Sequence, residues 1–547
     1  MAKTEWVLEG TPCKTFQEVI ERISGQSAED LMFPDLVAPE SIKNMPDAAT
    51  VINNAITNDD NIAVFGDYDA DGVCAMAILF LLLTELRAKK HSAKPITVRA
   101  PKRMSEGYGL SEAAVDEVND GLLIVVDNGI SAIDAIDKAK YKGLSVVVLD
   151  HHLPGVDLPN ADVIVDPFVD WAETDTGFCG AGLAFKLAEL MLQEEKDKGL
   201  LYKLNALAAI ATVADSVPLK DGNRAIVKQG LAAMNSKQMT QGLASIIAAC
   251  SLTKIDEETI AFKIAPVLNA AGRLYDDGAR YVSACLAQNM HPMDSLAQKL
   301  VNINETRKQL VKEACEVAYS QIDPSGAKPA ICVVPSKYEG IVGIVAGKIS
   351  EQYQVPAYVF SSNDGTLKGS GRADTDEFNL FEFTQQVADL LDRYGGHAGA
   401  VGLVLQEERL PEFKRRVGEE YALTEPANRN CVKYDMEISA FSVCDFIKEQ
   451  EKYAPYGVGA RKPVFMIRNV SLLETQGGFV QYMGKGRQHL KFRTRDYSLV
   501  GFDMAEKYSQ EGNPQKIDVV GTIGINESPF GTQVQVLIID FKKSEEQ

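Results

Sequence analysis

Between residues 50 and 170 the chain alternates short apolar runs with longer stretches of helical periodicity. The apolar runs predict five strands, at 62–65, 96–99, 122–126, 146–149 and 163–165, and helical patterns near 73–88, 111–119 and 131–141 separate most of them. This β–α–β alternation predicts a parallel sheet with helices on both faces. The apolar run from Val73 to Leu83 is shorter than the ~20 residues of a membrane span, so it predicts a buried helix.

Three regions with other patterns follow, and we expect an α/β protein of four parts. Residues 180–322 are rich in helical periodicity, and 294–322 predicts a helix of roughly 40 Å at 1.5 Å per residue, which could join two domains. A second α/β pattern begins near residue 330, and β-rich runs between turns after residue 430 predict a small β-barrel. The expected domains are 1–225, a helical connector at 226–325, 326–425 and 426–547.

The composition is that of a globular protein. Of 547 residues, 46% are hydrophobic and 24% are charged, which excludes disordered, collagenous and coiled-coil classes. The sequence has nine cysteines and no CxxC pair, which is typical of a protein in a reducing compartment. The first segment has no export signal, so we expect a cytoplasmic protein that is not bound to a membrane. The net charge of −20 argues against a large basic face for duplex nucleic acid, but it allows a narrow basic groove or an acidic site offset by cations.

Acidic residues and a histidine pair follow several of the predicted apolar segments. They are Asp67, Asp69 and Asp71 after the first strand, Asp127 after the third, Asp150, His151 and His152 after the fourth, and Asp215 after a later apolar run. The carboxyl ends of parallel strands meet at one edge of a sheet, where crowded carboxylates repel one another unless a cation neutralises them.

Two interpretations of these acids compete with a metal site. A single Asp after a strand is usually a helix cap, and the first three acids could form a calcium loop. Such a loop needs a bidentate Glu at its twelfth position, and Phe80 and Leu81 occupy that region here. Mixed carboxylate and imidazole ligands suit Mn²⁺ or Mg²⁺, and two such ions would activate water and stabilise the leaving oxygen of a phosphoester.

Four motifs carry a resemblance to a known family. GDYDADG, VDNG, LDHHLPG and VADSVPL, in this order, resemble the motifs of the DHH phosphoesterase superfamily and, within it, of the RecJ family of 5′→3′ exonucleases specific for single-stranded DNA. The likeness extends over most of the chain, through segments such as PKRMSEGYGLS, PVLNAAGRL, GIVGIVAGKI, GTLKGSGRA and GGHAGAVGL. It implies a DHH catalytic domain, a DHH-associated domain with the 5′-phosphate site and substrate cleft, and a C-terminal OB-like barrel.

The resemblance also implies roles for the acidic cluster. Two divalent ions, Mn²⁺ or Mg²⁺, would be bound, with one bridging ligand at Asp127. The full set of metal ligands would be Asp69, Asp71, Asp127, His151 and Asp215. Asp67 would be a further ligand or a partner of the metal-bound water, His152 would face the scissile phosphate, and Asp150 would orient a histidine.

A second group of residues is suited to binding the substrate. An Arg can hold a phosphate, a Tyr can stack on a base, and glycines let backbone amides approach an anion. The candidates are Arg103, Tyr108, Asn269, Arg273, Ser370, Arg372 and His397. By resemblance, Arg103, Ser370 and Arg372 would hold the 5′-terminal phosphate, and Asn269 and Arg273 would contact the strand near the cut.

In the last domain, residues 484–495 alternate basic with other residues. If they form one strand, a single face carries Lys485, Arg487, His489, Lys491, Arg493 and Arg495. A basic strand face on a small barrel is typical of proteins that bind single strands, although a solvated edge strand also carries Lys and Arg.

Two departures from the family pattern concern substrate handling. Lys337 and Tyr338 stand where relatives usually carry an aromatic–His pair, and Phe65 stands where relatives often carry His. The full set of acids is nevertheless present, so the metal chemistry is expected to be intact.

We therefore expect a monomeric, metal-dependent exonuclease for single-stranded DNA in repair and recombination, which releases 5′-mononucleotides. It would work beside a single-strand-binding protein and a helicase. Two alternatives remain open: a DHH phosphodiesterase of short oligonucleotides or cyclic dinucleotides, and a non-enzymatic, DNA-binding replisome scaffold.

Overall fold

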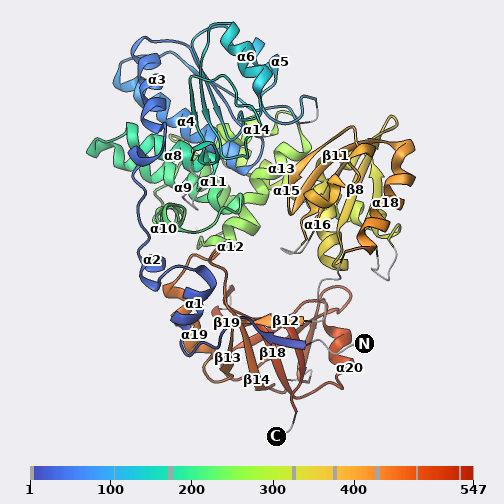
Figure 1. Cartoon of the computed structure of the whole chain (residues 1–547). Helices are drawn as coiled ribbons and strands as arrows, with labels where there is room; N and C mark the ends of the chain where they lie inside the picture. The colour runs from blue at the N-terminus through green and yellow to red at the C-terminus, as the bar shows by residue number, and fades with distance from the viewer. Residues whose placement is uncertain are drawn as a thin grey trace.

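The computed structural model describes residues 5–103, 105–170, 177–322, 328–373, 378–424, 431–475, 478–528 and 531–545. In the view of Figure 1, two α/β modules lie side by side above a β-rich module, and a group of helices connects them. We call these the first α/β module (37–191), the helical module (198–319), the second α/β module (330–422) and the β-module (5–32 with 431–545). Among the described helices, none combines the length and apolar character that crossing a membrane requires.

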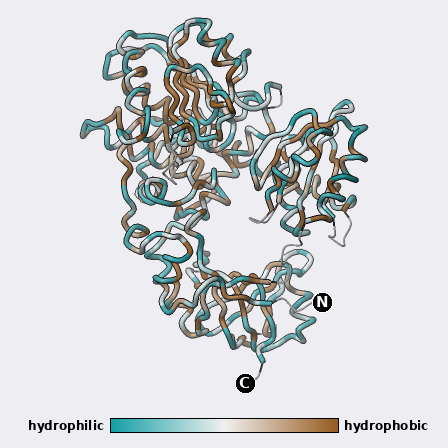
Figure 2. The backbone as a smooth tube through the Cα atoms, in the orientation of Figure 1, coloured by the Kyte–Doolittle hydropathy of each residue, from teal (hydrophilic) through white to brown (hydrophobic). Residues whose placement is uncertain are grey.

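The first α/β module is built on five parallel strands in the spatial order β3-β2-β4-β5-β6. Their bounds are β2 (Ile62–Phe65), β3 (Ile96–Arg99), β4 (Leu122–Val126), β5 (Ser145–Leu149) and β6 (Val163–Val165). These bounds confirm the predicted strands, with β5 one residue longer at its start. The strands stand out as hydrophobic in Figure 2, because both faces of the sheet are buried.

Helices cover both faces of this sheet. One face packs on α3 (Met45–Thr57), α4 (Ala70–Lys89) and α8 (Gly180–Met191), and the other on α5 (Glu112–Asp116) and α6 (Ile133–Tyr141). Alternate residues of β4 point to opposite faces: Ile124 packs with α4, whereas Val125 packs with α6. The run Val73 to Leu83 lies within α4 and is almost wholly buried, as predicted.

The helical module continues the core of the first α/β module. Its main helices are α9 (Lys198–Ala214), α10 (Asp221–Asn235), α11 (Gln241–Ala249), α13 (Ala265–Leu274), α14 (Gly278–Leu286) and α15 (Asp294–Tyr319). The expected domain boundary at 225/226 falls inside α10, which is one continuous helix packed along α9. The long helix α15 does join two modules: Leu300 packs in the first core, and Ala314 packs in the core of the second α/β module.

The second α/β module has a mixed five-stranded sheet in the order β10-β11-β9-β8-β7. The strands are β7 (Ala330–Pro335), β8 (Ala357–Asn363), β9 (Thr366–Arg372), β10 (Arg393–His397) and β11 (Ala400–Gln406). The sheet packs with α16 (Val342–Tyr353), α17 (Leu380–Gln385) and α18 (Leu410–Ala422), and a 3₁₀ turn, η4 (Ser336–Ile341), leads into α16.

The β-module contains a seven-stranded sheet in the order β13-β14-β18-β19-β17-β16-β15. Its strands are β13 (Met436–Ser439), β14 (Val464–Ser471), β15 (Val480–Met483), β16 (His489–Arg493), β17 (Ser498–Gly501), β18 (Lys516–Ser528) and β19 (Gly531–Lys543). We count β14 and β15 together as strand 1 and β16, β17, β18 and β19 as strands 2 to 5. From β14 to β15 the sheet order is then 1-4-5-3-2-1, so strand 1 borders both strand 2 and strand 4. That arrangement is the expected OB-like barrel.

The N-terminal segment belongs to the β-module, although the sequence predicts a first domain that begins at residue 1. Strand β1 (Glu5–Leu8) pairs in parallel with β12 (Cys431–Tyr434). Helices α1 (Phe16–Ser24) and α2 (Ala28–Met32) bury their apolar side chains against the barrel. The prediction fails here because the partner strand lies more than 400 residues away in sequence, and local patterns carry no sign of such a distant pairing.

One buried side chain ties this N-terminal segment and the barrel to the helical module. Arg224 on α10 donates hydrogen bonds from Nε to the carbonyl of Leu31 (2.8 Å) and from its terminal nitrogens to the carbonyls of Tyr453 (2.5 Å) and Pro455 (2.8 Å). Burial lowers the pKa of Arg224 to about 10. The three carbonyl partners compensate for burying this charge and fix the β-module against α10.

We expect Phe16→Ala to destabilise the β-module by about 3–5 kcal/mol, because Phe16 is buried against Tyr453 and Phe465. The measurement is urea unfolding of the Trp171→Phe variant, in which Trp6 is the sole tryptophan; Trp6 bonds to Asp540 of the barrel and reports on this module. Tyr141→Ala, at an exposed position on another module, should cost less than about 0.5 kcal/mol. Equal losses in both variants would show that the segment is not part of the barrel core.

Candidate metal centre and phosphate pocket

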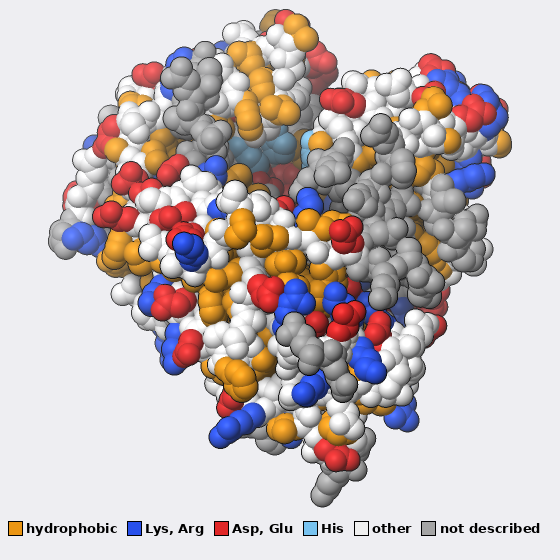
Figure 3. Space-filling model, turned by 60° about the horizontal axis from the view of Figure 1, so that its bottom comes forward, with side chains coloured by type: hydrophobic (Ala, Val, Ile, Leu, Met, Phe, Trp, Pro, Cys, Tyr) orange, Lys and Arg blue, Asp and Glu red, His pale blue; other side chains and the backbone are white. Residues whose placement is uncertain are grey.

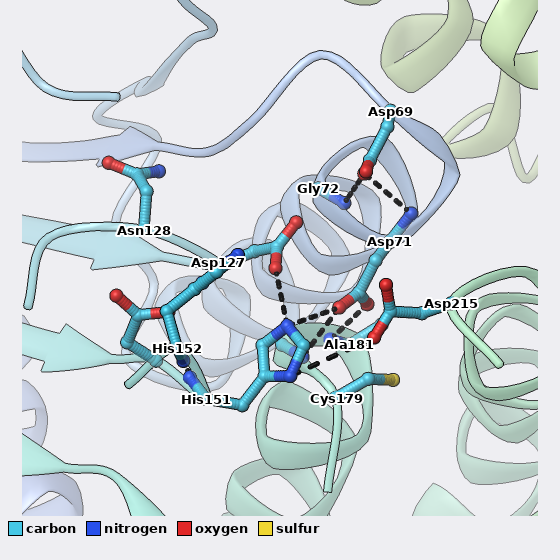
Figure 4. A network of polar contacts seen from close by, with 12 residues as sticks. Asp69, Asp71, Gly72, Asp127, Asn128, His151, His152, Cys179, Ala181 and Asp215 are labelled. Carbon is cyan, nitrogen blue, oxygen red and sulfur yellow. Dashed lines mark hydrogen bonds and ion pairs between the residues drawn. The ribbon is translucent and has the colours of Figure 1, made fainter. Parts of the chain in front are cut away.

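The acids that follow the strands of the first α/β module come together at one edge of its sheet, as predicted (Figure 4). Three overlapping groups have ligand atoms within 4.8 Å of one another and could each hold a cation. They are Asp67–Asp69–Asp127, Asp71–His151–Asp215 and Asp127–His151–His152. Because Asp127 and His151 each occur in two groups, the arrangement can hold two cations side by side.

The first turn of α4 and the start of α8 fix two of these carboxylates. Asp69 is the N-cap of α4 and accepts hydrogen bonds from the backbone N–H groups of Asp71 and Gly72, both at 3.1 Å. Asp71 in turn accepts from the N–H groups of Gly180 and Ala181, both at 2.7 Å. The positive end of the α8 dipole therefore stabilises the charge of Asp71 and orients its carboxylate.

Backbone geometry at the end of β4 places the central carboxylate. Asp127 has a left-handed φ of 59°, an uncommon conformation that Asp and Asn tolerate best among non-glycine residues. A Cβ at position 180 would lie 2.5 Å from the Asp127 Cβ, so only glycine at position 180 lets α8 approach this closely. Asp127 Oδ1 is 3.0 Å from His151 Nε2, which also lies 3.5 Å from Asp71 Oδ2.

The two histidines have opposite electrostatic surroundings. Burial lowers the pKa of His151, whose Nδ1 lies 3.7 Å from Asp215 Oδ2, and keeps its ring neutral, as a metal ligand must be. Burial also opposes a charge on His152, but the hydrogen bond to Asp150 (Nδ1 to Oδ1, 2.7 Å) and the charge of that carboxylate raise the pKa of His152 to about 9. Tyr108 Oη lies 3.0 Å from the other ring nitrogen.

Asp150 is the buried anchor of this pair. Its carboxylate accepts hydrogen bonds from the N–H groups of Ile130 (2.9 Å) and His151 (2.8 Å) as well as the ring of His152. Burial alone would favour the neutral form, yet these hydrogen bonds and the charge of His152 hold the pKa of Asp150 below its usual value. Asp150 therefore orients a histidine, in the position that the sequence comparison implies.

For the remaining carboxylates, positive charge from His152 and Arg103 compensates too little of the burial and repulsion. Burial and then the neighbouring carboxylates raise the pKa of Asp67 and Asp127 well above their usual range, and raise that of Asp215 to about 8. Asp67 Oδ1 is buried and has no hydrogen-bond partner among the described residues. Divalent cations would relieve both the repulsion and the unsatisfied oxygen, so the residues fit the two-metal site that the sequence predicts.

A pocket of about 230 Å³ lies where the first α/β, helical and second α/β modules meet. Arg103 follows β3, Arg273 is in α13, and Ser370 and Arg372 are in β9. Burial and then the charge of Arg103 lower the pKa of Arg273, to about 10, and that of Arg372. Because these guanidinium groups repel one another, the pocket favours an anion such as a phosphate.

Sequence reasoning missed two residues of this pocket, Lys368 and Glu339. Side chains at alternate positions of β9 share a face, so Lys368 lines the pocket together with Ser370 and Arg372. This period-two pattern in GTLKGSGRA could have revealed Lys368. Glu339 comes from η4, which packs on β8, and its place in the pocket depends on this tertiary contact, which the sequence does not show.

The other predicted substrate residues lie near the pocket but differ in their contacts. Asn269 accepts a hydrogen bond from the N–H of Ala70 (2.7 Å), so it braces the start of α4. His397 is at the exposed end of β10, where burial and then the charge of Arg372 lower its pKa. Tyr68, which sequence reasoning also missed, lies beneath Arg103, with the guanidinium carbon 4.7 Å from the ring centre.

The segment that replaces the expected aromatic–His pair has a structural place. Tyr338 is buried and donates a hydrogen bond to Glu313 of α15 (3.3 Å), and Lys337 lies 3.9 Å from the same carboxylate. These contacts fix η4 against the long helix, next to the wall of the phosphate pocket that carries Glu339.

The basic face of the barrel is shorter than predicted. Strand β16 contains only His489, Lys491 and Arg493 of the six basic residues, opposite the buried Leu490 and Phe492. The prediction of one strand over 484–495 is wrong, because the chain turns between β15 and β16. The positive φ angles of Gly484 (83°) and Arg487 (55°) mark that turn. Lys485 and Arg487 lie in this turn, and Arg495 lies in the next one.

In the OB-like order β16 is the second strand, and the turn that carries Lys485 and Arg487 leads directly into it. The second and third strands and the loop between the first two strands form the usual binding face of an OB fold. Aromatic rings lie within it: the Arg487 guanidinium is 5.0 Å from the Tyr482 ring centre, and His489 contacts the exposed Phe502 edge-on at 5.3 Å.

Figure 3 shows histidine and acidic side chains within a hollow on one face of the molecule. At the metal centre, 44% of the His152 side chain and 31% of the Asp215 side chain are exposed, so the centre is open to solvent. Comparisons with known proteins agree with this architecture. Family models match residues 61–212 (DHH family, N-terminal domain), 328–422 (DHHA1 domain) and 434–540 (RecJ OB domain). The fold and the acidic site thus define a protein of the DHH class.

Individual relatives indicate which family within this class the chain belongs to. The chain is 32% identical over 528 residues to the single-stranded-DNA-specific exonuclease RecJ of Bacillus subtilis, covering 93% of this chain and 65% of that protein. It is 31% identical to RecJ of Thermus thermophilus, covering 94% of this chain and 73% of that protein. A crystal structure of the Thermus protein in complex with Mn²⁺ superposes with a TM-score of 0.79 and 26% identity, over 100% of this chain and 80% of that one. The chain belongs to the RecJ family.

Without divalent cations, we expect the protein to lose stability as the pH rises from 5 to 8. A carboxyl group whose pKa is raised in the folded state holds a proton that the unfolded chain releases, so unfolding becomes easier as pH rises toward the folded pKa, about 8 for Asp215. The raised pKa of His152 acts in the same direction, and the lowered pKa of His151 opposes it.

The measurement is urea unfolding in chelator and in Mn²⁺ across this pH range. Mn²⁺ should stabilise the protein, most strongly at pH 8, because the cation replaces the missing protons. Asp127→Asn, which suits the left-handed backbone, should reduce both the pH slope and the effect of Mn²⁺. A stability that rises with pH in chelator would contradict the proposed electrostatics of this site.

Proposed function

We propose that this chain is a metal-dependent exonuclease that hydrolyses single-stranded DNA from the 5′ end and releases 5′-mononucleotides. The observation that carries the proposal is the pairing of a two-metal site with an adjacent cationic pocket. The charges of Arg103 and Asp69 both influence the pKa of Arg273, so the pocket and the carboxylate cluster act on one another. A strand end anchored in the pocket would place a neighbouring phosphodiester at the metals.

The geometry of the cluster supports the roles that the family resemblance implies for the acidic residues. Asp69, Asp71, Asp127, His151 and Asp215 would hold two divalent ions, with Asp127 between them. When bound, the ions would activate water and stabilise the leaving 3′ oxygen. Manganese or magnesium fits this oxygen-rich donor set.

The remaining residues of the cluster act on the water and the phosphate. Asp67 offers its unpartnered oxygen as an acceptor for the attacking water. His152, kept protonated by Asp150, would stabilise negative charge on the scissile phosphate, and Tyr108 steadies that ring. A base next to the 5′ end could stack near Tyr108, whose side chain is exposed.

Polarity would come from the phosphate pocket. Arg103, Arg273 and Arg372 present charged, bidentate donors, and Ser370 fixes Arg372 through a 2.7 Å hydrogen bond. A terminal phosphate monoester carries more negative charge than a phosphodiester, so such a pocket prefers a 5′-phosphorylated end. Asn269 would act indirectly, by positioning the first turn of α4. Because burial and the charge of Arg372 lower the pKa of His397, this residue would offer a neutral imidazole beside the pocket.

The β-module would hold the strand that leads to the cleft. Its basic strand and turn, with Tyr482 and Phe502 beside them, combine phosphate contacts with surfaces for base stacking. This module disfavours a phosphodiesterase of short oligonucleotides or cyclic dinucleotides, which needs no such surface. The complete acidic cluster disfavours a non-enzymatic replisome scaffold.

The wider context is also a proposal. A helicase and a single-strand-binding protein would supply and protect the substrate in repair and recombination, with the enzyme acting as a monomer. All nine cysteines are free, which fits a reducing cytoplasm. The proposal extends to the whole activity of the family although the chain spans 65% of the length of the Bacillus relative.

Digestion of a single-stranded oligonucleotide labelled at either end tests the proposal. With Mn²⁺, the wild-type chain should release mononucleotides from the 5′ end, spare duplex DNA and stop in chelator. Asp127→Asn should lower the rate more than about a thousandfold while leaving DNA binding in place, because it removes the shared metal ligand. Asp137→Asn, an exposed carboxylate of α6, is the matched control. Release from the 3′ end, or activity on dinucleotides alone, would contradict the proposal.

The double variant Lys491→Gln/Arg493→Gln should weaken binding to long single strands about tenfold at low salt. Each lost phosphate contact should reduce the slope of log K against log salt by about 0.7, so the pair should reduce it by about 1.4. Cleavage of a trinucleotide, too short to reach the barrel, should be unchanged. Lys448→Gln/Lys452→Gln on α19 (Val443–Lys452) removes the same charge from another face; equal effects of both pairs would indicate a non-specific charge effect.

A further inference from the structure

The phosphate pocket contains one acid among its cations. Of the described residues that line it, Arg103, Arg273, Lys368 and Arg372 are positive and Glu339 is negative. A carboxylate in a pocket that favours anions weakens phosphate binding by direct repulsion. A carboxylate at this position is therefore expected to have a specific role in the pocket.

Glu339 forms an ion pair with Lys368, the most exposed of the four cationic side chains that line the pocket. Its Oε1 lies 2.9 Å from Lys368 Nζ, with 18% of the Glu339 side chain and 49% of the Lys368 side chain exposed. Arg372 is held differently, by hydrogen bonds to Ser370 Oγ and the carbonyl of Gly371, both at 2.7 Å. The guanidinium of Arg372 therefore keeps its full charge for a ligand, whereas the charge of Lys368 is compensated by Glu339.

The walls of the pocket allow little rearrangement around this pair. A Cβ at position 343 would lie 3.0 Å from Arg372 Nη2, and a Cβ at position 340 would lie 2.0 Å from the carbonyl oxygen of Arg273. Both glycines flank the start of α16 directly after Glu339. Close packing thus holds Glu339 at the pocket, with Lys368 as the partner that can move, because its long side chain extends from the strand.

The chemistry of the proposed reaction gives this pair a task. Water adds to the phosphorus between the first two nucleotides, the bond from phosphorus to the 3′ oxygen breaks, and that oxygen leaves as a hydroxyl after taking up a proton. The shortened strand keeps the phosphate as its new 5′ end. The released mononucleotide still carries its own 5′-phosphate in the pocket, and it must leave before the next end can bind.

We propose that Glu339 is a release residue: by holding Lys368 in an ion pair, it keeps the fourth cation from closing on the terminal phosphate and sets how fast the mononucleotide leaves. This inference rests on the proposed function, since it assumes that the pocket holds a 5′-phosphate. The affinity for a dianionic phosphate should respond to the charge at position 339, whereas the affinity for an uncharged nucleoside should not.

Equilibrium dialysis of thymidine 5′-monophosphate against the full chain in chelator tests the inference without catalysis. Glu339→Gln should bind the nucleotide at least tenfold more tightly than the wild type, and Lys368→Met at least threefold more weakly. The double variant should bind more tightly than Lys368→Met, because it lacks the unpaired carboxylate, and more weakly than Glu339→Gln, because it lacks the fourth cation. Thymidine should bind all variants equally, and Glu351→Gln, an exposed acid on α16, should match the wild type. Inhibition of strand digestion by the nucleotide should strengthen in Glu339→Gln by the same factor.

Failure of this inference is distinguishable from failure of the proposed function. Unchanged or weaker nucleotide binding in Glu339→Gln, in a variant that unfolds at the wild-type temperature, would overturn the release role. If the double variant binds the nucleotide as tightly as Glu339→Gln does, Lys368 does not contact the phosphate, and its proposed role would be overturned. If Arg372→Ala binds the nucleotide as the wild type does, the probe occupies another site, and both the release role and the 5′-phosphate anchor fall.

Discussion

The structure depends on the repulsion among carboxylates that the parallel sheet brings to one edge. Strands β2, β4 and β5 end side by side, and each delivers acidic residues to the same small volume. Protein groups compensate only part of this charge: the start of α8 holds Asp71, and backbone amides and a histidine hold Asp150. Asp67, Asp127 and Asp215 remain destabilised when ionised, which makes cation binding part of the stability of the folded chain as well as of its chemistry.

The second organising feature is that no single module contains the whole of the proposed substrate site. The metal centre combines residues of the first α/β module with Asp215 from the helical module. The phosphate pocket needs Arg103 from the first α/β module, Arg273 from the helical module and Arg372 from the second α/β module. Helix α15 packs in two cores and sets the spacing between these walls. On the opposite side, Arg224 fixes the barrel and the N-terminal segment against α10. Under the proposed function, substrate polarity and strand capture would therefore depend on the assembled chain.

Local signals in the sequence were sufficient for the elements that carry the chemistry. Apolar runs gave the strands of the first sheet almost to the residue, and the acids directly after them predicted the cluster because parallel strands share one carboxyl edge. The features that sequence reasoning missed depend on contacts between distant segments. The pairing of β1 with β12 joins segments more than 400 residues apart in sequence, and Glu339 enters the pocket only because η4 packs beside β8, where Glu339 pairs with Lys368 of β9. The basic strand was predicted too long, because alternation continues through a turn in which Arg487 has a positive φ.

The most direct test of the account is the number of manganese ions that the chain binds. Isothermal titration of the metal-free protein with Mn²⁺, checked by elemental analysis after dialysis, should give two ions per chain for the wild type. Asp127→Asn should bind at most one ion, and more weakly, because the ligand shared by the two groups is changed. Two ions bound with wild-type affinity in Asp127→Asn, or none in the wild type, would contradict a metal centre built on Asp127.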